Sequence, residues 1–208
     1  MKYNSFEIVK LFEDQIASYT GAPYAIAIDS CTNAIFLVCK YLNVKDVVIP
    51  SKTYLSVPNS IIHAGGNVTF DRTEQANNWK GIYQLKPYPI YDSALRLTSK
   101  MYITNAFMAI SFHSKKNLPI GKGGMILCDS HDAMIWFKKA RYEGRSEKNY
   151  KNDNIEFCGW NMYMTPDQAA RGLYLFQNYP ECKEDKIEEG GYRDLTEFSV
   201  FSSHDQIV

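Results

Sequence analysis

The sequence has no excess of charge of either sign, because 23 Lys and Arg residues balance 23 Asp and Glu residues in a chain of 208 residues. A chain without net charge creates no long-range field that would recruit nucleic acid or an anionic membrane. Any site for an anion must therefore be local. No apolar run reaches transmembrane length, and the start, MKYNSFEIVK, lacks the basic and then apolar order of a signal peptide. We expect a cytoplasmic protein.

Cysteine and histidine are scarce and scattered. The five cysteines have no C-x-x-C spacing and lie mostly in apolar segments, which predicts reduced thiols in the core. No histidine forms a ligand pair with another His or Cys at helical spacing, so we expect no metal site. The length and the 45% apolar content suit one good core, which we assign to residues 1–178. Residues 179–208 are charged and contain glycine, and we expect a tail of uncertain structure there.

Apolar residues recur with helical spacing from Phe6 to Tyr19, and Gly21 follows as a helix C-cap. Short apolar runs and helical segments then alternate, which predicts a mostly parallel sheet covered by helices. We expect strands at 24–28, 46–50, 67–70, 89–91, 106–110 and 124–128, the last as a hairpin-like return, and helices at 34–39, 54–64, 133–142 and 165–178. Residues 71–86 have no clear period and are interpreted as a surface excursion, and residues 145–154 as a loop.

One segment contains a candidate reactive lysine. SFHSKKNLPIGKGG, from Ser111 to Gly124, puts a lysine between an apolar strand and a glycine-rich turn. A lysine forms an imine with a carbonyl group only when a fraction of it is neutral, which burial or a nearby cation favours. Taken alone, a Lys-Lys pair in a turn is more often a solvated basic turn.

The register of this segment resembles the S-F-H-x-x-K-N-L…G-E-G-G block of the DegT/StrS family of pyridoxal-phosphate-dependent sugar aminotransferases. In that register Lys116, not Lys115, forms the Schiff base with pyridoxal 5'-phosphate. Ser111 lies five residues before Lys116, at the spacing of a phosphate-binding hydroxyl of the family. Lys122 replaces the glutamate of the family block.

Two further segments resemble the family motifs that hold the cofactor ring. Asp92 follows an expected strand, and the resemblance of YDSA to E-D-A-A-Q implies that its carboxylate pairs with the ring nitrogen, with Leu95 in place of the glutamine. Without the resemblance, an Asp that caps a turn is an equally good interpretation. Tyr54 matches the aromatic residue of P-S-x-T-F/W/Y, which stacks on the ring, whereas by itself it reads as a core tyrosine.

The remaining motifs concern the phosphate. Ser30-Cys31-Thr32-Asn33 precedes an expected helix, where backbone N–H groups and hydroxyls can bind an anion, although plain N-capping is the commoner use of such a turn. It resembles the family's S-G-T-A-A, with Cys31 in place of glycine. GWNMYM resembles G-Y-N-Y-R-M, whose asparagine reaches the phosphate of the neighbouring subunit's cofactor. Asn161 therefore implies a homodimer, and Tyr163 replaces the arginine.

The motifs run in family order from Phe6 to Gly172, but the chain is short. From Asp71 to Asp92 it uses about twenty residues where the family uses several times as many, and the C-terminal domain has no counterpart of adequate length. The resemblance implies a three-layer α/β/α sandwich, a reduced form of the large domain of fold-type I pyridoxal enzymes. Such shortening would suit a compact viral genome. A truncated sheet should also leave apolar surface exposed, which we expect a dimer interface to cover.

The activity implied by the resemblance is transfer of an amino group from glutamate to a nucleotide-linked keto sugar, with Lys116 and Asp92 as catalytic residues. Three alternatives stay open. The chain can be a catalytically silent cofactor-binding or partner subunit of a full-length homologue, a cofactor-free scaffold, or a lyase or dehydratase that uses the same imine. The retained lysine argues against the family's dehydratases, in which a histidine takes its place.

Overall fold

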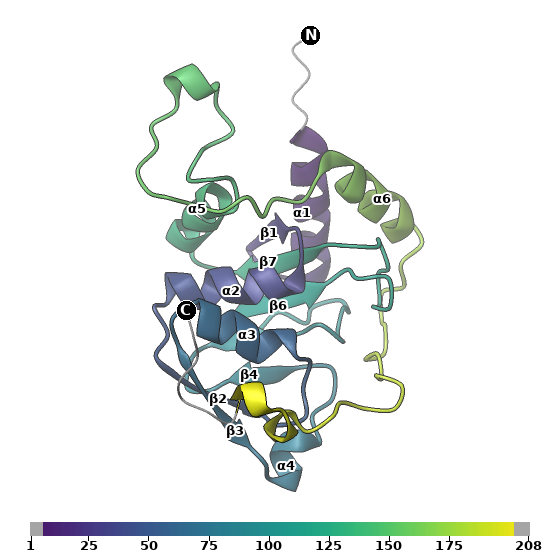
Figure 1. Cartoon of the computed structure of the whole chain (residues 1–208). Helices are drawn as coiled ribbons and strands as arrows, with labels where there is room; N and C mark the ends of the chain where they lie inside the picture. Colours follow the sequence, from purple (N-terminus) through teal and green to yellow (C-terminus); the bar gives the residue numbers. More distant parts are fainter. Residues whose placement is uncertain (1–5, 202–208) are drawn as a thin grey trace.

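The structure is a computed structural model that describes residues 6–201 (Figure 1). The first five residues, on which part of the signal-peptide argument rests, and the last seven residues of the expected tail lie outside this range. Among residues 6–201, no helix combines the length and the apolarity that crossing a membrane requires.

Five strands form the main sheet. Their spatial order is β1 (Tyr24–Ile28), β7 (Gly124–Cys128), β6 (Phe107–Ser111), β5 (Ile90–Asp92) and β4 (Tyr83–Leu85). A second, parallel sheet pairs β2 (Asp46–Pro50) with β3 (Asn67–Asp71). The Val48 N–H donates to the Lys86 carbonyl at 2.8 Å and the Lys86 N–H donates to the Val48 carbonyl at 3.0 Å. This bridge places β2 beside β4, at the edge of the main sheet.

Helices cover both faces of the main sheet, as side-chain alternation along the strands requires. Phe107 and Ala109 of β6 belong to one buried cluster, which includes residues of α2 (Cys31–Tyr41) and α5 (His131–Ala140). Met108 and Ile110 belong to the other cluster, which includes residues of α1 (Glu7–Thr20) and α6 (Pro166–Phe176). α3 (Ser56–His63) packs on α2 and β3. The expected three-layer α/β/α arrangement is confirmed.

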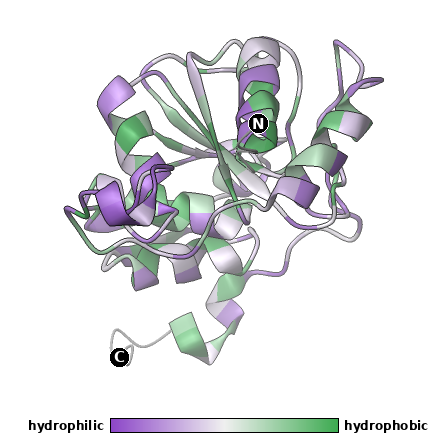
Figure 2. Cartoon of the chain, turned by 90° about the horizontal axis from the view of Figure 1, so that it is seen from above, coloured by the Kyte–Doolittle hydropathy of each residue, from purple (hydrophilic) through white to green (hydrophobic). Residues whose placement is uncertain are grey.

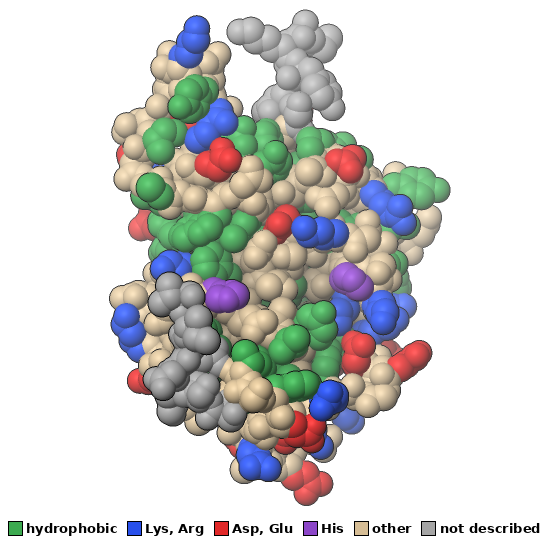
Figure 3. Space-filling model, in the orientation of Figure 1, with side chains coloured by type: hydrophobic (Ala, Val, Ile, Leu, Met, Phe, Trp, Pro, Cys, Tyr) green, Lys and Arg blue, Asp and Glu red, His purple; other side chains and the backbone are tan. Residues whose placement is uncertain are grey.

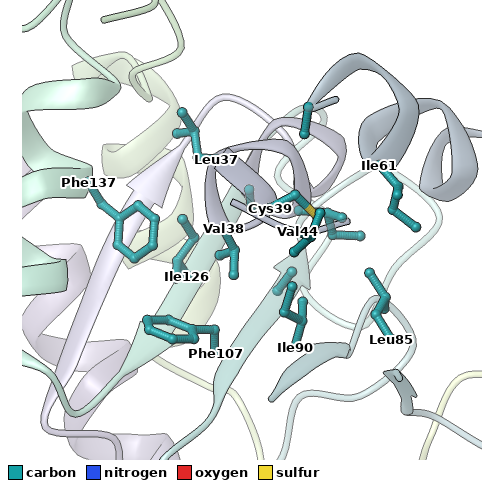
Figure 4. Close-up of a cluster of buried hydrophobic side chains, with 14 of the residues drawn as sticks. Leu37, Val38, Cys39, Val44, Ile61, Leu85, Ile90, Phe107, Ile126 and Phe137 are labelled. Carbon is teal, nitrogen blue, oxygen red and sulfur yellow. The ribbon is translucent and has the colours of Figure 1, made fainter. Parts of the chain in front are cut away.

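Apolar side chains from both sheets meet in the first cluster (Figure 4). Phe137 of α5 and Phe107 of β6 lie against the strands, while Leu85 and Ile90 extend the core toward β4 and β5. Figure 2 shows the same partition by hydropathy, with hydrophobic colour on the inner strands and hydrophilic stretches on the outer helix turns. One core therefore continues from β1 to β3.

The expectation of a mostly parallel sheet is corrected by the structure. β5 and β6 are parallel, but β1 with β7, β6 with β7 and β4 with β5 are antiparallel. Only residues 86–89 separate β4 from β5, and a parallel crossover needs a dozen or more residues. The predicted return of residues 124–128 is confirmed as β7.

The interpretation of residues 71–86 as a surface excursion is wrong in part. The segment contains α4 (Glu74–Asn77) and strand β4, in which Tyr83 and Leu85 are buried. A strand of three residues shows too little alternation to be recognised from the sequence. Residues 145–154, expected as a loop, contain one short 3-10 helix, η1 (Tyr150–Asn152).

The predicted helix boundaries are largely confirmed. Gly21 ends α1 with φ 78° and donates its N–H to the Ala17 carbonyl. Thr165 precedes α6 and Pro166 begins it, and Gln168 Oε1 accepts from the Thr165 N–H at 2.9 Å in a capping box. α6 ends at Phe176, two residues before the expected end.

A buried ion pair ties α1, β1 and the end of α5 together. Arg141 donates to Glu13 Oε1 and, at 2.6 Å, to the Ala27 carbonyl, while Glu13 Oε1 accepts from the Ala27 N–H at 2.9 Å. Both side chains are almost fully buried. Removal of one partner from such a pair typically costs about 3–5 kcal/mol, so the three elements are held in register on the side of the sheet away from β4.

The expectation about cysteines is confirmed in part. All five thiols are free, and Cys39 and Cys128 lie in the core, where burial raises the pKa of each to about 12. Cys158 and Cys182 are exposed, so the prediction of core positions is wrong for them. Both lie in irregular segments, where a neighbouring apolar residue says little about burial.

Candidate active site

A cavity of about 240 Å³ opens where β5 and β6 end and α2 begins. Asp92 is the last residue of β5, Ser111 the last residue of β6, and Cys31 the first residue of α2. All three line the cavity. Ligands of open α/β sheets bind in the crevice outside the carboxyl ends of parallel strands, and β5 and β6 are such a pair.

The loop between β6 and β7 presents Lys116 to this cavity. Phe112, Leu118 and Ile120 anchor the loop in the core, and the Ser114 N–H donates to the Gly121 carbonyl at 3.1 Å across its base. The Lys116 side chain is 13% exposed, and its Nζ lies 3.5 Å from Glu188 Oε2. Lys115, the neighbouring residue, is exposed. Both lysines line the cavity, and they differ in that the side chain of Lys116 is largely shielded from solvent.

Asp92 is buried at the cavity wall and is held by two donors. The Ala94 N–H donates to Oδ1 at 2.9 Å and the Tyr83 hydroxyl donates to Oδ2 at 3.1 Å. Burial raises the pKa of Asp92, and both hydrogen bonds and the charge of Lys116 oppose that rise. A carboxylate in this state would gain from a cationic partner inside the cavity.

The start of α2 has the groups of an anion site. Ser30 is the N-cap, with its Oγ accepting from the Asn33 N–H at 3.1 Å, and Thr32 lines the cavity beside it. The first N–H groups of a helix have no intrahelical acceptor, and the helix dipole favours negative charge there. Gly124 permits this arrangement, because a Cβ on it would lie 2.4 Å from the Cys31 nitrogen. The helix start and β7 therefore touch backbone to backbone.

Aromatic side chains line the mouth of the cavity. Trp79 and Tyr192 stack with ring centroids 5.7 Å apart at 18°, and Tyr54 meets Tyr192 edge-on at 6.4 Å. Tyr54 is 60% exposed, so it is not the core tyrosine that was the alternative interpretation. A flat ring that enters the cavity would meet aromatic surface here.

Most of the predicted site residues lie together. Seven of the nine line the one cavity: Ser30, Cys31, Thr32, Tyr54, Asp92, Ser111 and Lys116. Asn33 does not line it, because its side chain donates to Asp29 Oδ1 at 2.7 Å. Asn161 lies elsewhere on the surface and donates to Glu143 Oε1 at 2.9 Å.

The departures from the family motifs have visible consequences. Burial and the charge of Asp92 raise the pKa of Cys31 well above its ordinary value, so its thiol stays neutral. Lys122 Nζ lies 3.7 Å from Asp29 Oδ2, beside the start of α2. Tyr163 packs on Phe6, at a ring-centroid distance of 5.7 Å, and offers no cation. Leu95 is buried.

Four cavity or support residues were missed from the sequence. Trp79 and Tyr83 lie in the segment that was interpreted as a surface excursion, although two aromatic residues four positions apart in a polar stretch were a usable signal. Glu188 and Tyr192 lie in the expected tail, where nothing in the sequence pattern indicates a contact with the lysine loop. The Tyr83 hydroxyl, which donates to Asp92, also accepts a hydrogen bond from Thr53 Oγ1 at 2.6 Å, and this links Asp92 to the segment before α3.

Comparison with known proteins gives relatives of one kind. The model of the DegT/DnrJ/EryC1/StrS aminotransferase family matches residues 2–77 and 102–193. The spore coat polysaccharide biosynthesis protein SpsC of Bacillus subtilis (strain 168) is 25% identical over 232 residues, which cover 88% of this chain and 60% of SpsC. The chain thus spans less than two thirds of the length of the curated relatives it matches.

Solved structures share the fold. PseC of Helicobacter pylori, an aminotransferase involved in the biosynthesis of pseudoaminic acid, has a TM-score of 0.69 at 14% identity, over 84% of this chain and 58% of PseC. The putative sugar aminotransferase Spr1654 of Streptococcus pneumoniae, in its PLP form, has a TM-score of 0.68 at 20% identity, over 83% of this chain and 59% of that chain. Residues 78–101 of this chain, which the family model does not match, include β4 and β5, where this chain is shortened. Since the model matches most of the chain, the protein belongs to the DegT/DnrJ/EryC1/StrS aminotransferase family.

Proposed function

We propose that this protein is a pyridoxal-phosphate-dependent aminotransferase that acts on a sugar. The observation that supports it best is the meeting of Lys116, Asp92 and the start of α2 in one cavity. These groups come from three separate parts of the chain. Amine, carboxylate and anion site are the groups that this cofactor requires of a protein.

The residues present fit the cofactor. The Asp92 carboxylate, whose pKa burial raises, would be matched by a protonated ring nitrogen. The helix start at Ser30 and Thr32, with the Ser111 hydroxyl beside it, would take the phosphate, and the neutral Cys31 thiol would not repel it. Tyr54 would lie against the ring. When bound, the cofactor supplies an electron sink for the carbanion that forms at the amino acid's α carbon.

Lys116 would have two tasks. Its Nζ would bind the cofactor's aldehyde carbon, and after release it would carry the proton between the donor's α carbon and the cofactor's C4' carbon. The anchored loop holds this atom in the cavity, because Leu118 and Ile120 are buried on either side of the turn. Asp92 would hold the ring nitrogen in its protonated form throughout.

We propose glutamate as the amino donor and a nucleotide-linked keto sugar as the acceptor. The basic residues Lys115 and Lys122 and the imidazole of His113 line the cavity, and they suit an anionic substrate such as a nucleoside diphosphate. The stacked Trp79 and Tyr192 suit a flat or apolar sugar face. Among the structurally similar proteins, PseC is an aminotransferase involved in the biosynthesis of pseudoaminic acid, and Spr1654 is a putative sugar aminotransferase.

The test is covalent capture of the cofactor. Purified protein mixed with pyridoxal 5'-phosphate should develop visible absorbance, and borohydride should fix one cofactor per chain on Lys116. Mass spectrometry of the digested protein locates the adduct, with Lys115 as the internal control. An adduct on Lys115, or spread over exposed lysines, would show that the proposed register is wrong.

The alternative function is a cofactor-binding subunit that is catalytically silent and works with a full-length homologue. Two features favour this alternative: Tyr163 stands where the family motif has an arginine, and Glu188 contacts Lys116. It predicts the same adduct on Lys116 but no reaction with an amino donor. A lyase or dehydratase would instead consume its substrate without forming the amino form of the cofactor.

We also propose a homodimer, because Asn161 is exposed and lies outside the cavity of its own chain. Several large apolar side chains are also at the surface, among them Tyr150, Tyr174 and Leu11. Light scattering at micromolar concentration should report twice the mass of one chain, and Asn161→Ala should weaken cofactor binding without dissociating the dimer. A cofactor-loaded monomer would remove the role of Asn161 across the interface.

A further inference from the structure

The segment that follows α6 is docked on the molecule before it reaches the cavity. In Figure 1 it descends, green to yellow, along the side of the molecule toward α4. The Lys186 N–H donates to the Leu95 carbonyl at 2.7 Å, and the Ser99 N–H donates to the Glu181 carbonyl at 3.1 Å. Arg96 binds both carboxylate oxygens of Asp185, at 2.7 and 2.6 Å. Residues 181–186 are thus a first anchor.

A second anchor lies on the other side of the cavity, next to Tyr54. The Leu195 N–H donates to the Ser51 carbonyl at 2.8 Å, and the Ser51 hydroxyl donates to Asp194 Oδ2 at 3.1 Å. Leu195 is 3% exposed, and it begins the 3-10 helix η2 (Leu195–Glu197), which is followed by η3 (Ser199–Phe201). The seven residues 187–193 between the anchors, which we call the strap, therefore cross the mouth of the cavity.

Two strap residues turn inward and line the cavity. Glu188 Oε2 lies 3.5 Å from Lys116 Nζ and accepts from the Tyr192 hydroxyl at 3.4 Å. The ring of Tyr192 stacks on Trp79. Burial, together with the charge of Glu188, raises the pKa of Tyr192, so its hydroxyl stays protonated and able to donate.

The rest of the strap is exposed and contains a flexible turn. Ile187 is 83% exposed, and Gly190 and Gly191 have positive φ of 79° and 68° with open space around them. Glycine adopts this backbone without strain and moves between conformations readily. The strap is thus fixed at both ends, and within it one backbone hydrogen bond, from the Gly191 N–H to the Glu188 carbonyl at 3.0 Å, closes the exposed glycine turn. On the face in Figure 3, hydrophobic side chains gather beside acidic and basic groups low on the molecule, where this segment ends.

We propose that the strap gates the cavity and that Glu188 is a positioning residue that latches Lys116. In the closed form the amine donates to the carboxylate, and Tyr192 covers the mouth. A carbonyl compound reaches Nζ only after Glu188 lets go, which the Gly190–Gly191 turn permits. The seven residues of the strap thereby close the site. The proposal rests on the proposed function only in taking Lys116 as the reacting amine.

The test is reductive methylation of the protein without cofactor, using formaldehyde and cyanoborohydride. The amine nitrogen bonds to the formaldehyde carbon, the carbonyl oxygen leaves as water, and hydride from cyanoborohydride reduces the imine. Tandem mass spectrometry gives the rates at Lys116 and Lys115 separately. Glu188→Gln should raise the rate at Lys116 by roughly three- to tenfold, the effect of losing about 1 kcal/mol of ion pairing. Lys115 should react at an unchanged rate.

Glu189→Gln is the matched control, since Glu189 is the exposed neighbouring carboxylate of the same strap, and it should leave both rates unchanged. Tyr192→Ala should raise the Lys116 rate as well, by uncovering the mouth. An unchanged Lys116 rate in Glu188→Gln would overturn the latch. An equal rise at Lys115 would also overturn it, because the loop would then have loosened as a whole. The experiment contains no pyridoxal phosphate. If the protein does not bind the cofactor, the methylation rates still test the latch.

Discussion

Replacing Lys116 with alanine is expected to abolish both capture of pyridoxal phosphate and the reaction with an amino donor. Lys115 and Lys122 also line the cavity, but Lys115 is exposed and Lys122 lies beside Asp29, whereas the Lys116 side chain is only 13% exposed. Visible absorbance, the borohydride adduct and release of a keto acid from L-glutamate should all disappear. Lys115→Ala is the matched control, and it should keep all three.

The fold should survive this change. The ion pair of Lys116 with Glu188 is partly exposed, and pairs of that kind contribute about 1 kcal/mol or less. Thermal unfolding of Lys116→Ala should therefore stay within a few degrees of the parent protein. A large drop in Tm would contradict the account, because it would make Lys116 a packing residue.

Asp92→Asn is expected to slow conversion of the bound cofactor by L-glutamate about 10²- to 10³-fold, the usual effect of removing one preorganised electrostatic partner. An amide does not hold the ring nitrogen protonated, so the carbanion loses its electron sink. Stopped-flow absorbance at saturating glutamate measures the rate. Asp92→Glu, which keeps the charge, should recover part of it. Conversion by Asp92→Asn at the parent rate would remove Asp92 from the mechanism.

The same substitution makes a stability prediction with a definite sign. Because burial raises the pKa of Asp92 from its ordinary value of 3.8, the folded state holds the proton more tightly than the unfolded state. The stability linked to that proton is complete at acid pH and is lost as the pH rises through the raised pKa. At pH 7 the ionised carboxylate thus costs stability, and Asp92→Asn should have a Tm equal to or above that of the parent. The Ala94 N–H can still donate to the asparagine oxygen.

Where periodicity was long enough, the sequence predicted the fold correctly. Helix α1 has four turns of apolar spacing closed by Gly21, and β7 follows a glycine-rich turn that allows an antiparallel return. The failures are short elements. β4 has three residues, which are too few for an alternation of apolar and polar side chains to be seen. It pairs antiparallel with β5 because only four residues connect the two strands, and the sequence pattern alone does not identify that short connection as a turn.

Some residues of the candidate site could likewise be predicted from the sequence, and others could not. Lys116, Asp92 and Ser30 stand at the ends of strands or at a helix start, so their meeting could be predicted from alternating elements together with the family motifs. Glu188 and Tyr192 lie at the cavity because the segment that contains them is held in place by long-range contacts. One of these joins Arg96 to Asp185, which are 89 positions apart in the sequence. Contacts of this kind are made by tertiary packing and leave no local pattern.

The most direct measurement is reaction of the cofactor-loaded protein with L-glutamate alone. No sugar is needed, because the first half-reaction requires only Lys116, Asp92 and access for the donor. We expect loss of the visible absorbance and release of one equivalent of 2-oxoglutarate per chain. Absorbance lost without the keto acid would indicate cofactor dissociation. A spectrum that stays unchanged across a panel of amino-acid donors would contradict the account and leave the silent partner subunit as the better function.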